Sequence, residues 1–334
     1  MKMLKIMPLA LILLALAVFV PSPALMEGTF FTLYGQFTAV AAGFAAMLLN
    51  KTRKLTLNLG GSDAEMEAIE RVKTPALAFC CTAAALVGAR LLYCLVRYDF
   101  YLFDVGLAGI LRIWEGGFML YGAAAGAMLA AFALAKAKGA SAAVVLDQIA
   151  APGMMAVALT RMAEGTTTEG VGTWIENDFF CRFPFAVQNE WGEWQLAVYL
   201  FESIAAVIIL FALLRMRGKA PGEKILTAIL LYAGCQVVLE SMRMDACLRI
   251  GFVRVSQVLS GIAILAVTLI RTRRFGKKTA AVNGALCVAG IAVCGIIEWA
   301  LDKTSVSNLI LYPVMIAVCA ALVYNAMRYA RKNG

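Results

Sequence analysis

Histidine is absent from this 334-residue chain. Without an imidazole, the chain has no histidine general base, no histidine metal ligand and no Ser-His or Cys-His nucleophile pair. Its nine cysteines include no CxxC pair of the kind that zinc and redox sites use. We therefore expect no metal and no cofactor, and we interpret most of the cysteines as small buried apolar residues.

Charged residues are scarce as well, at 15% of the chain, whereas soluble domains contain about a quarter. Apolar residues make up 62%, and the mean hydropathy is +0.81. The sequence thus predicts an all-α polytopic membrane protein with about ten transmembrane helices, because ten segments approach the roughly 20 residues that span a bilayer. They are 6–25, 30–49, 74–95, 117–135, 142–160, 195–214, 223–242, 252–270, 280–300 and 307–327. The segment 6–25 is either a retained helix, which we favour, or a cleaved signal peptide.

The formal net charge of +9 indicates membrane topology rather than a nucleic-acid partner, which we do not expect. If the ten helices alternate, all the basic clusters and both termini are cytoplasmic. The clusters are 51–54, 136–138, 215–219, 271–278 and 328–332. The polar segment 55–73 is expected to rest at the cytoplasmic interface. On the outer side, loop 163–194 is rich in tryptophan and acidic residues, and a disulfide between Cys181 and Cys247 would be permitted there.

Three charged residues stand at the end of an apolar segment, in the stretch 161–172. Arg161, Glu164 and Glu169 would each cost roughly 2.5–3.5 kcal/mol if they faced lipid at a helix centre. We therefore expect them to line a polar chamber or to reach water. Charges placed inside a membrane protein indicate a functional site.

Other polar residues fall within or beside the apolar segments. Arg90 must either snorkel to the interface or pair inside the bundle. Gln236, Glu240 and Arg243 are spaced to share one helical face, which should point inward. Tyr121 follows a double glycine near the outer surface, whereas the four-residue spacing of Gly122 and Gly126 is typical of close helix packing.

Taken together, these motifs resemble the bacterial prolipoprotein diacylglyceryl transferase family. The resemblance covers about residues 30–270, which would form the family's seven-helix core. It implies extra elements at 1–29 and 271–334, the latter forming two additional helices. The motifs that carry it, in chain order, are Tyr34-Gly35, Gly88-Ala89-Arg90, Trp114-Glu115-Gly116-Gly117, Gly122 with Gly126, Arg161 with Glu169 and Gly172, Glu202-Ser203, Glu240 with Arg243, and Ser256-Gln257.

The chain departs from the family pattern at polar positions. Tyr121 stands where the family has histidine, Glu164 where it has asparagine, and Gln236 where it has arginine. The family's Gln-Leu-Tyr-Glu-Ser is here Tyr-Leu-Phe-Glu-Ser, residues 199–203.

The resemblance implies transfer of a diacylglyceryl group from phosphatidylglycerol to the cysteine thiol of a lipoprotein precursor, at the outer face of the bacterial plasma membrane. It implies catalytic roles for Tyr121, Arg161, Glu164 and Glu169. Substrate-binding roles are implied for Tyr34, Arg90, Gly172, Glu202, Gln236, Glu240 and Arg243. Arg161 would bind the phosphate, with Arg243 as a second cation, because a guanidinium binds phosphate oxygens bidentately.

Two further interpretations remain open. A repurposed, inactive member of the family could bind an anionic phospholipid or a membrane partner, since three polar positions have changed. A transporter is the third class, but the sequence has none of the repeats and broken helices that transporters use.

Overall fold

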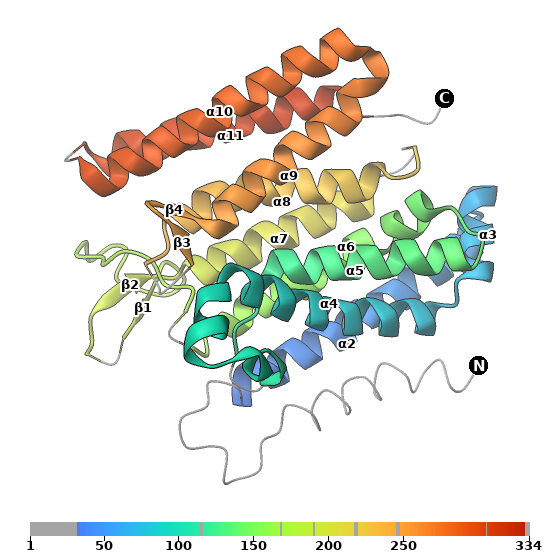
Figure 1. The fold of residues 1–334 in the computed structure, drawn as a ribbon, viewed down its shortest axis with the longest axis horizontal. Coiled ribbons are helices and arrows are strands. Elements are labelled where there is room, and N and C mark those ends of the chain that lie inside the picture. Colours follow the sequence, from blue (N-terminus) through green and yellow to red (C-terminus); the bar gives the residue numbers. More distant parts are fainter. Residues whose placement is uncertain are drawn as a thin grey trace. The chain divides into compact units, whose positions relative to one another are not determined.

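A computed structural model of the chain describes residues 32–113, 116–167, 169–189, 191–216, 220–244, 248–304 and 306–330. The expected segment 6–25 and Cys247 of the permitted disulfide lie outside these residues. The chain divides into two compact units, Met1–Thr167 and Thr168–Gly334, which are coloured blue to green and yellow to red in Figure 1.

Helices and the loops that connect them make up the described residues of the first unit. Its elements are α2 (Thr32–Leu59), α3 (Asp63–Arg71), α4 (Thr74–Val96), the short helices η2 (Phe100–Asp104) and η3 (Leu107–Leu111), α5 (Leu120–Ala137) and α6 (Ala142–Glu164). Helix α4 packs against α5, and α2 against α6. A Cβ atom on Gly122 would collide with the carbonyl oxygen of Gly88, and one on Gly126 with that of Ala84. The glycines therefore allow α4 and α5 to approach closely, as their spacing predicts.

The second unit combines five helices with two short hairpins. Its elements are β1 (Ala186–Gln188), β2 (Trp194–Leu196), α7 (Val198–Arg215), α8 (Glu223–Ser241), β3 (Arg249–Ile250), β4 (Val253–Arg254), α9 (Val255–Thr272), η5 (Arg273–Phe275), α10 (Lys277–Lys303) and α11 (Asn308–Arg328). Both hairpins are antiparallel, with Val187 opposite Gln195 in the first. Leu230, Ile264 and Met315 are fully or almost fully buried in a core that joins α8, α9, α10 and α11. Figure 1 shows α10 and α11 as an antiparallel pair.

Eight helices among the described residues are long and apolar enough to cross a membrane, namely α4 to α11, with η5 continuing α9. The chain is therefore an all-α polytopic membrane protein, as its composition predicts. These eight correspond to eight of the ten predicted segments. Segment 30–49 corresponds from Thr32 onward to α2, which is not among the eight.

The polar segment 55–73, whose place at the cytoplasmic interface stays a prediction, is divided between two helices. Residues up to Leu59 belong to α2, and α3 forms separately with Ser62 as its N-cap in a capping box with Glu65. Arg53 explains why α2 continues, because its guanidinium is buried and donates to Gln148 Oε1 at 3.0 Å, Thr74 Oγ1 at 3.0 Å and the Ala68 carbonyl at 3.2 Å. A buried charge is tolerated where such partners satisfy it.

Candidate functional site

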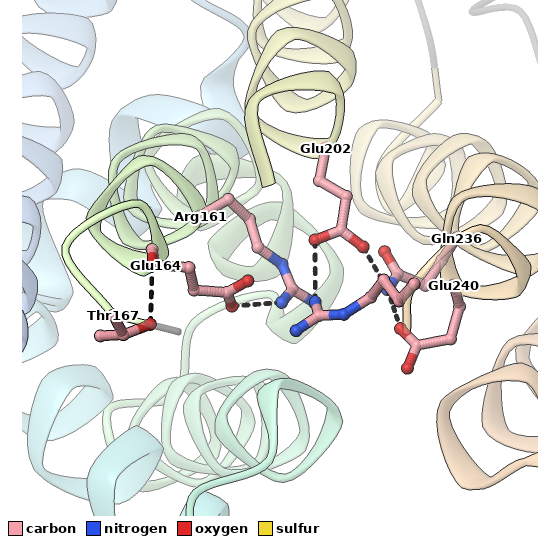
Figure 2. Close-up of polar contacts among 7 residues, drawn as sticks. Arg161, Glu164, Thr167, Glu202, Gln236 and Glu240 are labelled. Carbon is pink, nitrogen blue, oxygen red and sulfur yellow. Dashed lines mark hydrogen bonds and ion pairs between the residues drawn. The ribbon is translucent and has the colours of Figure 1, made fainter. Parts of the chain in front are cut away.

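The first candidate cluster lies at the carboxyl end of α6. Arg161 and Glu164 are three residues apart on the last turn, and the Arg161 guanidinium forms a buried ion pair with the Glu164 carboxylate. Figure 2 shows the two side chains turned toward each other. The hydroxyl of Thr167 donates to the Glu164 carbonyl oxygen at 2.7 Å, and that of Thr166 to the Ala163 carbonyl oxygen at 2.7 Å. The same two carbonyls also accept from the backbone amides of Thr167 and Thr166 at 2.9 Å and 3.0 Å, so the carbonyl groups at this helix end have partners.

Arg90 occupies a different environment in the same unit. Its five N–H groups face five backbone carbonyls of the segment between α4 and α5, those of Gly109, Ile110, Arg112, Gly116 and Gly117. Arg90 is 4% exposed, and the Cζ atom of its guanidinium lies 5.3 Å from the centre of the Tyr101 ring. Arg90 thus pairs inside the protein and does not snorkel. Because a guanidinium has five donors in all, the loop carbonyls account for each of them.

Tyr121 and Tyr34 complete the predicted set of the first unit. Tyr121 is half-buried in the first turn of α5, whereas Tyr34 lies in the first turn of α2. Glu115, which precedes the double glycine, lies outside the described residues.

Burial raises the pKa of the Tyr101 phenol, whose ring lies beside Arg90, to about 12, so that phenol stays neutral at physiological pH.

The second candidate cluster joins α7 to α8 in the second unit. Glu202 of α7 is fully buried, and Gln236 and Glu240 of α8 are 1% and 4% exposed. The Gln236 amide nitrogen donates to Glu202 Oε1 at 3.0 Å and to Glu240 Oε2 at 2.7 Å, as Figure 2 shows. Arg243 Nη1 reaches Glu202 Oε2 at 3.2 Å. The structure therefore brings four of the predicted residues together, two of them carboxylates.

Gly172 holds the backbone of Arg243 in place. The two residues face each other in an isolated antiparallel bridge, and the Met244 amide donates to the Val171 carbonyl at 2.9 Å. A Cβ atom on Gly172 would lie 2.6 Å from the carbonyl oxygen of Met242, so only glycine allows this approach without a shift. Glu169, three residues earlier, is exposed and belongs to the second unit.

Comparison with known proteins identifies the family. The family model described as "Prolipoprotein diacylglyceryl transferase" matches residues 24–272, which is well over half of the chain. The chain belongs to this family.

Several relatives carry the name phosphatidylglycerol–prolipoprotein diacylglyceryl transferase. One from Listeria welshimeri is 31% identical over 198 residues, covering 57% of this chain and 70% of the relative. One from Listeria innocua is 27% identical over 247 residues, which cover 72% of this chain and 88% of the relative. One from Streptococcus pneumoniae is 33% identical over 189 residues, which cover 54% of this chain and 70% of the relative.

The match to the diacylglyceryl transferase family ends at residue 272, the last residue of α9. Helices α10 and α11 lie beyond it, although they pack against α8 and α9. The division into a core at 30–270 and additions at 1–29 and 271–334 remains a prediction.

Sequence reasoning missed two buried charged residues near the second cluster. Arg254, before α9, donates through Nη2 to the Arg243 carbonyl, and Glu298 of α10 accepts from the Gln257 amide. Glu298 lies in a predicted apolar segment, so the cost of an intramembrane charge could have identified it. Arg254 lies at a hairpin end, where the sequence gives no comparable signal.

Proposed function

We propose that this protein transfers a diacylglyceryl group from phosphatidylglycerol to the cysteine of a lipoprotein precursor. In this reaction the thiolate attacks the glycerol carbon that carries the phosphate ester. A carbon–sulfur bond forms, the carbon–oxygen bond breaks, and glycerol phosphate leaves with the electron pair. The thiol proton passes to a base, because only a few per cent of a free thiol with a pKa of about 8.5 is ionised at pH 7.

The observation that carries this proposal is the buried Arg161 at the end of α6, in a chain of the diacylglyceryl transferase family. A guanidinium keeps its charge and offers paired donors to phosphate oxygens. The leaving glycerol phosphate gains negative charge as the ester bond breaks, so a fixed cation stabilises the transition state more than the ground state. We assign Arg161 this role.

The other predicted residues divide into groups that touch the substrate and groups that position them. Glu164 or Glu169 accepts the thiol proton, since carboxylates are better bases than the Tyr121 phenol, which instead orients a substrate oxygen. Arg243 supplies a second positive charge.

Arg90 and Gly172, by contrast, position backbone segments. The hydrogen bonds of Arg90 all go to loop carbonyls, and Gly172 packs against the end of α8. Tyr34 remains assigned to substrate binding by resemblance alone.

A second candidate function is lipid or partner binding without transfer, and the Arg161–Glu164 pair favours it. Glu164 replaces a neutral asparagine of the family and already neutralises the guanidinium. A phosphate would have to compete with that carboxylate for Arg161. In this alternative the protein holds an anionic phospholipid or a membrane partner, and no thioether forms.

We place the protein in the bacterial plasma membrane as a multi-pass protein with both termini in the cytoplasm. The basic clusters at helix ends support this orientation, because cytoplasmic loops are enriched in Lys and Arg. The acceptor is the signal-peptide region of a lipoprotein precursor, presented at the outer face.

Complementation tests the proposal. A bacterium depleted of its own diacylglyceryl transferase should grow when it expresses this chain, whereas Arg161→Ala should fail to support growth. Arg215→Ala is the matched control. Like Arg161, Arg215 lies at the carboxyl end of an apolar helix, here α7, but unlike Arg161 it is exposed. Control cells should grow like wild type.

Two results would overturn parts of the proposal. If the wild-type chain is present in the membrane but the cells do not grow, transfer is rejected. Phosphatidylglycerol that stays bound to the purified protein, detected by mass spectrometry, would then support the binding function. Growth with Arg161→Ala equal to wild type would reject the role of Arg161.

A further inference from the structure

Helix α10 contributes a buried acid to the end of α8. Glu298 is 8% exposed and accepts a hydrogen bond from the Gln257 amide nitrogen. The same nitrogen donates to the Val237 carbonyl at 3.2 Å, one residue after Gln236 of the second cluster. Glu298 therefore contacts the cluster's helix through a single intervening side chain.

Gln257 extends the connection to Arg243. Its Oε1 accepts from the Arg254 backbone amide at 3.0 Å, and Arg254 in turn donates from Nη2 to the Arg243 carbonyl. Gln257 and Arg254 are 6% and 4% exposed. The contacts thus run without interruption from Glu298 through Gln257 and Arg254 to the backbone of Arg243.

Each link has a chemical reason. With Nε2 turned to the Glu298 carboxylate, the Gln257 amide has its oxygen available for the Arg254 N–H, so the carboxylate fixes the orientation of the amide. That amide sets the first turn of α9 and, with it, the position of the Arg254 side chain. Partners of this kind orient groups at a site without touching the substrate.

We propose that Glu298 is a positioning residue for Arg243, so that the helix pair beyond the family match contributes to the transferase site. The expected effect on turnover rests on the proposed function, whereas the positioning of Arg243 by Glu298 does not. The helix pair α10–α11 makes a second contact with the same segment, because the Tyr312 hydroxyl donates to the Ser241 carbonyl at 3.4 Å. Glu298 thereby makes the family-matched part depend on helices that follow it.

The test compares two substitutions in α10 of the full-length protein, purified in detergent. Glu298→Ala removes the acceptor. Asn283→Ala is the matched control, because Asn283 is also buried and is hydrogen-bonded to Asn325 of α11 and to Tyr329, the residue that follows α11. The two positions are 15 residues apart, roughly 22 Å along the helix at 1.5 Å per residue, so each substitution removes a buried polar side chain of α10 but only Glu298→Ala removes the link to Gln257.

Two readouts are measured for each variant. The first is transfer from phosphatidylglycerol micelles to a cysteine-containing precursor peptide. The second is amide hydrogen exchange of residues 240–244, which requires no activity.

Glu298→Ala should lower kcat by about ten- to a hundredfold, since a displacement of about 1 Å costs roughly that much, with KM for phosphatidylglycerol little changed. It should also speed exchange at 240–244. Asn283→Ala should change neither, and Glu298→Gln should restore both because its amide oxygen still accepts.

The results separate this inference from the proposed function. If the wild-type protein shows no transferase activity, the proposed function is rejected. The positioning role of Glu298 is then decided by amide hydrogen exchange at residues 240–244 in Glu298→Ala, without the kinetic readout. Exchange and kcat in Glu298→Ala that match Asn283→Ala would overturn the inference. If Glu298→Ala does not fold, Gln257→Asn replaces it, because the shorter amide loses its reach to Glu298. Wild-type exchange in that variant would also overturn the inference.

Discussion

At the scale of single residues, Gln236 shows how this chain differs from its family. The amide stands where the family has arginine, and it donates to both buried carboxylates of the cluster, Glu202 and Glu240. Its own oxygen is buried and has no hydrogen-bond partner among the described residues. A neutral side chain therefore satisfies two acids, and Arg243 supplies positive charge to Glu202.

Substitutions at Gln236 should change stability in opposite directions. Gln236→Leu removes the donors from two buried carboxylates, and each unsatisfied group costs about 1–3 kcal/mol. Gln236→Arg adds a charged donor between the same acids. We expect a lower apparent unfolding temperature in detergent for Gln236→Leu and a higher one for Gln236→Arg, measured by scanning fluorimetry. A shift of both variants in the same direction would contradict this account.

The sequence predicted the part of this cluster that lies within one helix, but not the contacts between residues far apart in the chain. The four-residue spacing correctly placed Gln236 and Glu240 on one face of α8, because helical periodicity is local. Arg243 lies just past Ser241, the last residue of α8, so the helix does not extend to it. The pairing with Glu202 joins residues 34 and 41 positions apart, and no periodicity encodes such a contact.

At the scale of elements, Arg90 organises the segment between α4 and α5. Its donors bind carbonyls from η3 and from the double glycine before α5, where Gly116 and Gly117 have positive φ angles of 83° and 75°. Sequence periodicity predicted the two flanking helices and missed η2 and η3. Such short helices have little hydrophobic pattern of their own, and here a distant arginine binds their carbonyls.

Replacing Arg90 should loosen this segment while leaving α4 and α5 helical. Arg90→Lys keeps the charge but has three donors in place of five, so at least two loop carbonyls lose their partner. We expect proteolysis between 97 and 117 to accelerate by at least about tenfold, the factor that a loss of 1.4 kcal/mol gives. Arg97→Lys is the control, because Arg97 lies over the ring of Phe100 and binds none of these carbonyls. Equal cleavage of both variants would contradict the role assigned to Arg90.

At the scale of the whole molecule, hydropathy predicted the class of protein and most of its spans. Apolar length follows directly from bilayer thickness, which is why eight predicted segments correspond to helices that could cross a membrane. The sequence did not reveal that α2 continues past its basic stretch. That continuation depends on Arg53 finding partners in α4, α6 and the end of α3, which are contacts of the folded chain.

The orientation of the additional helix pair gives a test at this scale. Helix α10 begins at Lys277, within the basic cluster 271–278, and α11 ends at Arg328, the first residue of the cluster 328–332. Because basic clusters favour the cytoplasm, the turn between α10 and α11 should lie outside. Alkaline phosphatase, which is active only outside the cytoplasm, should therefore be active when inserted after Ser307 and inactive when fused after Gly334. The reverse pattern would place both termini of this pair outside and contradict the proposed topology, since α10 and α11 are antiparallel and a single crossing separates the two fusion points.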